Sequence, residues 1–171
     1  MNYMQQIKTE IFNATNEVRM GFALQPVSYS NVLDRMGQIH TNEMYTHKFF
    51  LHENPYCTEV ETLYDRVIYC GLYGMYNMFG ENLADFPAFD GMINISPLQR
   101  LFNKFIDQTL INAKELSRKT IKGWYNSPGH RANLLCPDYD SVGFGLLLYF
   151  KRCYGVKVRY LLVTQNFGKK I

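Results

Sequence analysis

The sequence predicts a single α+β domain that combines amphipathic helices with a pair of antiparallel strands. Apolar residues recur at helical spacing from Ile7 to Phe50 and again after Asn112, whereas residues 142–167 alternate in hydrophobicity as strands do. With 171 residues, 47% of them hydrophobic, the chain can bury one sizeable core and is too short for two comfortable domains. We therefore expect one domain over residues 1–171.

Two helices are predicted in the N-terminal part of the chain. Apolar residues three and four positions apart define a first amphipathic helix over residues 7–19, and a second stripe after Pro26 extends from Leu33 to Phe50. His40 lies on the inward stripe of the second helix, where we expect a buried histidine that is hydrogen-bonded to a neighbouring loop. Both helices should dock one face on the core.

The middle of the chain has a weaker pattern. Residues 52–91 are rich in Tyr, Asn, Gly and Pro, which predicts surface loops apart from a short helix around residues 61–69. Two helical patterns follow Pro97, and the second begins at Asn112 with an N-x-x-E capping signal that Glu115 completes.

The helix that begins after Asn112 should end at a sharp corner. Pro128 disfavours helical geometry in the residue before it, which places the end near Ser127, and Gly129 allows the backbone to turn. We therefore expect His130 to project from a rigid turn.

Two strands complete the predicted fold. Residues 142–150 and 156–167 alternate in hydrophobicity and are separated by the pentapeptide KRCYG, which predicts an antiparallel hairpin. Both faces of the hairpin are apolar, so we expect it at the centre of a sheet rather than at an edge.

Composition and charge argue against several classes of protein. The net charge of +3 is not gathered into a basic stripe, so nucleic acid is a poor candidate partner. Residues 1–20 lack the apolar core of a secretion signal, which predicts a cytoplasmic chain or a mature form whose leader has been removed. The longest apolar run, residues 143–150, is far shorter than the roughly 20 residues that span a bilayer, so we expect no transmembrane segment.

The four cysteines leave two interpretations open. They form no C-x-x-C pair and lack zinc-finger spacing, so no sulfur-based metal site is expected at Cys57, Cys70, Cys136 and Cys153. An even count suits two disulfides in an oxidising compartment, but four buried thiols are equally ordinary in a chain of this length.

The sequence lacks the motifs of several catalytic classes. The four histidines do not form the H-E-x-x-H spacing of a helical zinc protease, and there is no G-x-S-x-G elbow and no glycine-rich phosphate loop. Three polar residues beside apolar or glycine-containing corners remain, namely His52, Glu81 and His130. Two imidazoles and a carboxylate suit zinc with an open coordination position, or a general base held by a neighbour. Their separation along the chain leaves open whether they meet.

Five sets of motifs follow one another in an order that resembles a known family. They are NEVR at 16–19, GQIHTNEM with FFLHENP at 37–55, GENLA at 80–84, WYNSPGHRANLL with YDSVGFG at 124–145, and TQNFG at 164–168. The chain resembles the CAP superfamily, which groups cysteine-rich secretory, antigen 5 and plant pathogenesis-related proteins, and it looks like the short bacterial form.

The resemblance carries expectations for the fold and the site. It implies a three-layer α-β-α sandwich with a central antiparallel sheet, and a location outside the cell, at its surface or in the periplasm. It places the two cleft histidines of the family on His52 and His130, and the G-E-N glutamate on Glu81. A second glutamate of eukaryotic members falls on Ser127, which cannot ionise at neutral pH. Residues 90–104 form an insertion relative to the compact bacterial pattern.

Three functions are consistent with such a site. The first is a binding module whose cleft and aromatic loops hold a lipid, a sterol or a protein. The second is a zinc-dependent, peptidase-like hydrolase in which His52 and His130 hold the metal and Glu81 activates its water. Two histidines are one protein ligand short of the usual catalytic three, and Ser127 replaces a possible base, so binding is favoured. In the third, the cleft is vestigial and the partner binds at residues 90–104.

Each site residue also has a structural alternative. His130 can hold the shape of its turn by bonding a backbone carbonyl. Glu81 can anchor the loop that GEN begins by accepting backbone N–H bonds, and this role is compatible with a role in the site.

Overall fold

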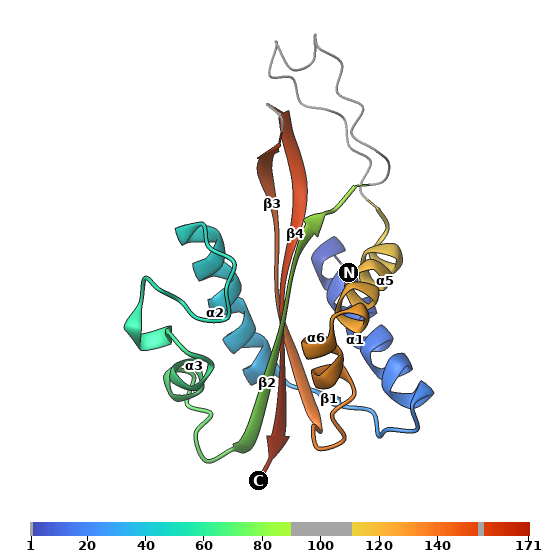
Figure 1. The fold of residues 1–171 in the computed structure, drawn as a ribbon, viewed down its shortest axis with the longest axis vertical. Coiled ribbons are helices and arrows are strands. Elements are labelled where there is room, and N and C mark those ends of the chain that lie inside the picture. Colours follow the sequence, from blue (N-terminus) through green and yellow to red (C-terminus); the bar gives the residue numbers. More distant parts are fainter. Residues whose placement is uncertain (1, 90–110, 154–155) are drawn as a thin grey trace.

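A sheet lies between two groups of helices (Figure 1). The computed structural model describes residues 2–89, 111–153 and 156–171, so the predicted insertion at 90–104 and the helical pattern directly after Pro97 lie outside the described residues. In chain order the elements are α1 (Tyr3–Gly21), β1 (Ser28–Tyr29), α2 (Asn31–His47), the 3-10 turn η1 (Thr58–Val60), α3 (Leu63–Tyr69), β2 (Tyr76–Pro87), α5 (Ala113–Asn126), α6 (Pro128–Leu134), β3 (Ser141–Cys153) and β4 (Val156–Lys170). Helices α2 and α3 cover one side of the sheet, and α1, α5 and α6 cover the other. The α-β-α sandwich is therefore confirmed.

The strands of the described sheet follow the order β1-β3-β4-β2. Strands β3 and β4 form the predicted antiparallel hairpin, with Ser141 opposite Gly168 and Cys153 opposite Val156, and they occupy the two inner positions. Strand β2 pairs antiparallel with β4 at one edge. The short β1 pairs parallel with β3 at the other edge, so the sheet is mixed rather than wholly antiparallel.

The predicted helices are present with small shifts at their ends. Helix α1 begins earlier than predicted, because Asn2 caps it by accepting a bond from the backbone of Gln5. Helix α2 ends at His47, before the predicted Phe50, because Lys48 takes a left-handed conformation with φ of 60°. Asn112 caps α5 as predicted. Among the described helices, none has the length and apolar character needed to cross a membrane.

The prediction of surface loops over residues 52–91 is wrong for β2. This strand runs for 12 residues, and it carries Glu81. Strand prediction depends on alternating apolar residues, but the buried positions of β2 include Glu81 and Asn82, whose side chains have polar partners inside the protein. A strand with a polar interior therefore has the composition of a loop.

Apolar residues fill both faces of the central hairpin. The larger core joins α1 and α5 to the sheet and includes Ile7, Ile11, Leu116, Trp124, Val142 and Phe144. On the opposite face, Leu162 of β4 contacts Met44 of α2 in a separate cluster. This two-sided burial explains why the hairpin sequence is apolar at nearly every position.

The NEVR segment joins α1 to the chain that follows α6. The Arg19 side chain is fully buried and donates hydrogen bonds to four backbone carbonyls, those of Gln25, Leu134, Cys136 and Tyr139. Asn16 exchanges two hydrogen bonds with the backbone of Val27. These residues have structural roles, because every bond fixes a turn of the main chain.

Two glycines of β3 permit a close approach of α2. A Cβ atom at Gly145 would overlap the backbone of Gly37 in α2, and one at Gly143 would overlap the backbone around Asp34. The same helix covers the backbone of β3, because Asp34 accepts from the Phe144 N–H at 2.9 Å. The VGFG motif is therefore a helix-packing surface.

We predict that Gly145→Ala destabilises the protein by about 1–3 kcal/mol, the usual cost of overpacking a close contact. The matched control is Gly123→Ala in α5, where an added Cβ meets nothing within 4 Å. This control should stabilise the fold by about 0.5–1 kcal/mol through its higher helix propensity. Urea denaturation measures both changes, and wild-type stability in Gly145→Ala would contradict the close packing of α2 on β3.

Candidate functional site

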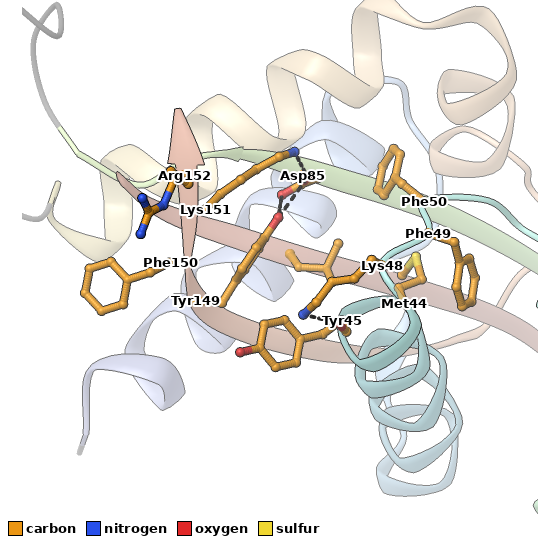
Figure 2. Close-up of a pocket in the computed structure, with 11 residues that line it drawn as sticks. Met44, Tyr45, Lys48, Phe49, Phe50, Asp85, Tyr149, Phe150, Lys151 and Arg152 are labelled. Atoms are coloured by element: carbon orange, nitrogen blue, oxygen red, sulfur yellow. Dashed lines mark hydrogen bonds and ion pairs between the residues drawn. The ribbon is translucent and has the colours of Figure 1, made fainter. Parts of the chain in front are cut away.

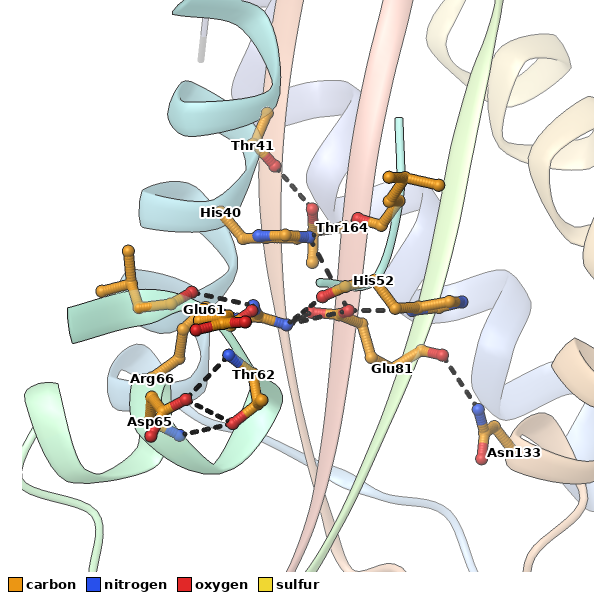
Figure 3. A network of polar contacts seen from close by, with 12 residues as sticks. His40, Thr41, His52, Glu61, Thr62, Asp65, Arg66, Glu81, Asn133 and Thr164 are labelled. Atoms are coloured by element: carbon orange, nitrogen blue, oxygen red, sulfur yellow. Dashed lines mark hydrogen bonds and ion pairs between the residues drawn. The ribbon is translucent and has the colours of Figure 1, made fainter. Parts of the chain in front are cut away.

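A buried carboxylate lies at the centre of the candidate site (Figure 3). The Glu81 side chain is only 3% exposed, and Arg66 Nη2 donates to both of its oxygens at 3.0 Å. His52 Nδ1 lies 2.9 Å from Glu81 Oε1. The structure thus brings two of the three predicted site residues into direct contact, with an arginine as a third partner that the sequence analysis did not include.

Arg66 connects the segments around this carboxylate. It extends from α3, is fully buried, and also donates to the backbone carbonyls of His52, Val60 and Glu61. One signal in the sequence could have identified it, since Arg66 lies on the same predicted helix face as Leu63 and Val67. A cation on an apolar stripe requires buried acceptors as its partners, either an anion or carbonyl oxygens.

The charge state of Glu81 follows from these contacts. Burial alone would raise the pKa of Glu81, but the hydrogen bond from His52 and the positive charge of Arg66 outweigh it and lower the pKa. Glu81 is therefore ionised at neutral pH and acts only as an acceptor. A carboxylate held this way is poorly suited to take a proton from water.

His52 presents one nitrogen to Glu81 and the other away from it. Since Glu81 is ionised, the Nδ1 atom carries the hydrogen of their 2.9 Å bond. In the neutral ring this leaves the lone pair on Nε2. The His52 side chain is 56% exposed, so this second nitrogen is available to a ligand.

His130 lies beside His52 but does not project from a turn. The two ring centres are 6.3 Å apart, with the ring planes tilted by 56°. Pro128 begins a new helix, α6, so the predicted turn is wrong and His130 occupies the first turn of that helix. Proline at the first helical position is a known start signal for a helix. Pro128 therefore begins α6 directly after the end of α5. Burial and the neighbouring His52 lower the pKa of His130.

His40 supports the site from inside α2. Its ring is fully buried, and Nε2 lies 2.9 Å from the carbonyl of Leu51, the residue before His52. This is the buried, loop-bonded histidine that we expected. Burial lowers the pKa of His40 to about 4, so the ring is neutral although Glu81 lies 3.9 Å away. His40 therefore positions the loop that carries His52.

Side chains of α5 and α6 cover the outer edge of β2. Trp124 Nε1 donates to the Leu83 carbonyl at 2.8 Å, and Asn133 Nδ2 donates to the Glu81 carbonyl at 3.0 Å. Asn82 in turn donates to the carbonyl of His130 at 3.2 Å. These bonds satisfy edge-strand groups that would otherwise need solvent or another chain. They also fix His130 relative to Glu81.

A groove of about 660 Å³ leads from His130 along β2 and α5. Its walls are mainly apolar and include Leu83, Phe86, Pro87, Phe89, Thr120 and Trp124. Ser127 lies in the same lining, where eukaryotic relatives were expected to carry a second glutamate. The volume falls within the range of small-molecule sites in proteins.

The site residues fit a metal ion only in part. A carboxylate bonded to one nitrogen of a histidine orients the other nitrogen for a metal, and Glu81 has this relation to His52. Among the described residues, no group of three or more His, Cys, Asp and Glu side chains is placed to hold one ion. His52 and His130 would therefore be the protein ligands, with the remaining positions left to solvent or a bound molecule.

The cysteines are separate from this site. All four have free thiols, and each is partly exposed. The interpretation with two disulfides therefore does not describe this structure. None of the four lines the groove beside His130.

Comparisons with known proteins identify the same architecture. The model of the cysteine-rich secretory protein family (CAP) matches residues 12–167. One similar solved structure is an extracellular SCP-domain protein from Bacillus anthracis, with 23% identity, a TM-score of 0.62, and coverage of 96% of this chain and 40% of that one. Another is an outer surface protein from Borrelia burgdorferi, with 16% identity and a TM-score of 0.60. The match covers 100% of this chain and 97% of that one.

A third similar structure is a cysteine-rich secretory protein from Staphylococcus aureus, with 18% identity, a TM-score of 0.57, and coverage of 99% of this chain and 40% of that one. The chain thus spans 40% of the length of the Bacillus and Staphylococcus proteins. At these identities the likeness shows a shared fold. No curated protein matches the chain in sequence.

We predict that Arg66→Met weakens the pH dependence that Glu81 contributes to stability. In the wild type the folded pKa of Glu81 is lowered, so its contribution is present above the unfolded value of about 4.3 and is lost as the pH falls. Without Arg66, burial is opposed mainly by the hydrogen bond from His52, so the folded pKa of Glu81 rises and the stabilising contribution above the unfolded pKa becomes smaller.

Removing one partner of a buried pair costs about 3–5 kcal/mol, so we expect this loss at pH 7 and a smaller loss near pH 4. Urea denaturation at several pH values measures the difference. The double variant Arg66→Met/Glu81→Gln is the control, because it has no buried charge and the Glu81-linked pH dependence should disappear. A pH-independent cost of Arg66→Met would contradict the assignment.

Proposed function

This chain belongs to the cysteine-rich secretory protein (CAP) family, and on that basis we propose that it is a binding domain whose groove beside His130 holds a lipid or a sterol. The groove carries the proposal, because it is concave, mainly apolar and bordered at one end by polar groups. Ligand sites in proteins commonly combine apolar walls with a few polar groups that orient the ligand. An apolar molecule with one polar end fits this description.

The groove favours a lipid or sterol over a folded protein partner. Its lining residues Phe86, Phe89 and Trp124 surround a hollow rather than a flat face. A folded protein would use a wider and flatter surface, with a standard interface of about 800 Å² on each partner. A small molecule can bury most of its surface in a groove of this size.

The state of Glu81 argues for binding rather than hydrolysis. A zinc hydrolase would require Glu81 to accept a proton from a metal-bound water. Both oxygens of Glu81 accept from Arg66, one of them also accepts from His52, and the lowered pKa keeps the group ionised. The observation therefore supports Glu81 as a residue that orients His52.

We propose that the domain acts outside the cytoplasm. Similar structures include a protein described as extracellular and one described as an outer surface protein. This location agrees with the one that the family resemblance implies.

We predict that the neutral fluorescent sterol dehydroergosterol quenches the emission of Trp124. This is the single tryptophan of the chain, and it forms part of the groove wall, so quenching reports directly on the groove. Gly123→Leu should weaken binding by about tenfold or more, the scale of steric mismatch in apolar pockets. The glycine lines the groove, and a Cβ atom added there meets no neighbouring atom within 4 Å.

The matched control for this experiment is Gly21→Leu. Gly21 also has open space around it, but it lies in a different hollow, between α1 and α5. The control should bind the sterol as the wild type does. Absence of quenching in the wild type, or equal loss in both variants, would contradict a ligand site in this groove.

We also expect His52 and His130 to share one zinc ion when zinc is supplied. Zinc accepts neutral imidazole nitrogens, and two protein ligands give a weak, exchangeable site. His52→Ala and His130→Ala should each weaken zinc binding by more than the roughly 10–100-fold that the loss of an outer-shell partner costs, as calorimetric titration would show. His47→Ala is the control, because His47 lies near Glu43 and stacks on Tyr56, away from the groove. Zinc binding that survives both site variants would contradict this assignment.

A further inference from the structure

A second concave site lies on the α2 side of the sheet, where α2 ends beside β3 and β4 (Figure 2). This pocket of about 340 Å³ shares only Phe50 and Asp85 with the groove beside α5. It contains none of His52, Glu81 and His130. The family site therefore does not account for it.

The floor of this pocket is apolar, and a tyrosine in its wall is fixed by hydrogen bonds. Met44 and Leu162 form the floor and are almost fully buried. The rings of Tyr45 and Tyr149 meet edge to face, with centres 5.3 Å apart. Tyr149 is held in place because its hydroxyl donates to both oxygens of Asp85, at 2.9 and 3.0 Å. A ligand with an apolar body would find a preformed surface here.

The mouth of the pocket carries an excess of positive charge. Among the described residues of its lining, three side chains are cationic, those of Lys48, Lys151 and Arg152, and one is a carboxylate, that of Asp85. Asp85 is already neutralised, because Lys151 Nζ lies 3.2 Å from it. The formal charge of the lining is therefore +2, from three cations and one anion.

Lys48 has the clearest position for contact with a ligand. Its left-handed conformation at the end of α2 turns the side chain over the Tyr45 ring, with Nζ 3.9 Å from the ring centre. Nζ donates one hydrogen bond, to the Tyr45 carbonyl at 2.7 Å. An ammonium group has three donors, so one bond leaves capacity for an anionic group of a ligand.

We propose that this pocket binds a single-chain amphiphile with a carboxylate head, such as a medium-chain acyl carboxylate. The chain lies over Met44 and Leu162, and the carboxylate lies at Lys48. The volume is near the lower end of the range for small-molecule sites, which suits one chain rather than the two chains of a membrane lipid. The positive mouth selects an anionic head over a neutral or cationic one.

The test is calorimetric titration of the full chain with decanoate, below its critical micelle concentration, beside decan-1-ol and decyltrimethylammonium. These probes share a ten-carbon chain and differ in head-group charge. Decanoate should bind most tightly and the cation most weakly, and added salt should weaken decanoate binding. Equal affinities for the three probes, or no decanoate binding, would overturn the proposal.

Two matched variants locate the charge that matters. Lys48→Gln should weaken decanoate binding roughly fivefold, the scale of one exposed ionic contact. Lys122→Gln should leave it unchanged, because Lys122 is an exposed lysine in the hollow between α1 and α5. Unchanged binding in Lys48→Gln, or an equal loss in Lys122→Gln, would overturn the assignment. Thermal unfolding confirms that both variants are folded.

A second readout places the ligand directly. Decanoate should shift the NMR signal of the Met44 methyl group, which lies in the pocket floor, and Met44→Leu identifies that signal. Dehydroergosterol should leave the signal unchanged and should not displace decanoate, because its proposed groove lies beside α5. Displacement by the sterol would overturn the separate site, and loss of sterol binding alone would affect only the proposed groove.

Discussion

The buried ion pair between Arg66 and Glu81 is the contact on which the polar centre of this fold depends. An ionised carboxylate cannot remain inside a protein without a cation and hydrogen-bond donors, and Arg66 supplies both. The same guanidinium holds the carbonyls of His52, Val60 and Glu61. It therefore joins α3, the loop that carries His52 and the edge strand β2. Helix α3 is short, and it is held both by this arginine and by Val67, which packs in a cluster with Leu33 and Met36.

The sequence predicted those helices and strands whose apolar residues recur with regular spacing and are buried in an apolar core. Helices α1, α2 and α5 and the β3–β4 hairpin all have apolar periodicity, and only their end residues shifted. Strand β2 was not predicted because two of its consecutive buried positions, Glu81 and Asn82, are polar. Arg66 was not predicted because its partner lies 15 residues away in sequence, and its place on an apolar helix face does not identify that partner. Family resemblance could point to Glu81 and the two histidines, but not to the arginine that sets the charge of Glu81.

The segment from Trp124 to Asn133 combines structural and site roles. Trp124 and Asn133 bond the backbone of β2 and close its outer edge, while Ser127 and Pro128 divide the segment into two helices. His130 is fixed by this arrangement, because Asn82 of the same strand bonds its carbonyl. Three residues of this segment, Trp124, Ser127 and His130, therefore line the groove. The position of His130 in this lining follows from these contacts.

The hydrogen bond between Glu81 and His52 links the geometry of the site to the kind of chemistry it supports. A base for hydrolysis needs a free lone pair and a pKa near the working pH. Glu81 is poorly suited to this role, since Arg66 and His52 bond its oxygens, only 3% of its side chain is exposed, and its pKa is lowered. The same bond fixes the ring of His52 and directs its other nitrogen outward, which favours the recognition of a ligand. The contacts that make Glu81 a poor base thus provide an orienting group at the end of an apolar groove, and this combination supports the proposed binding function.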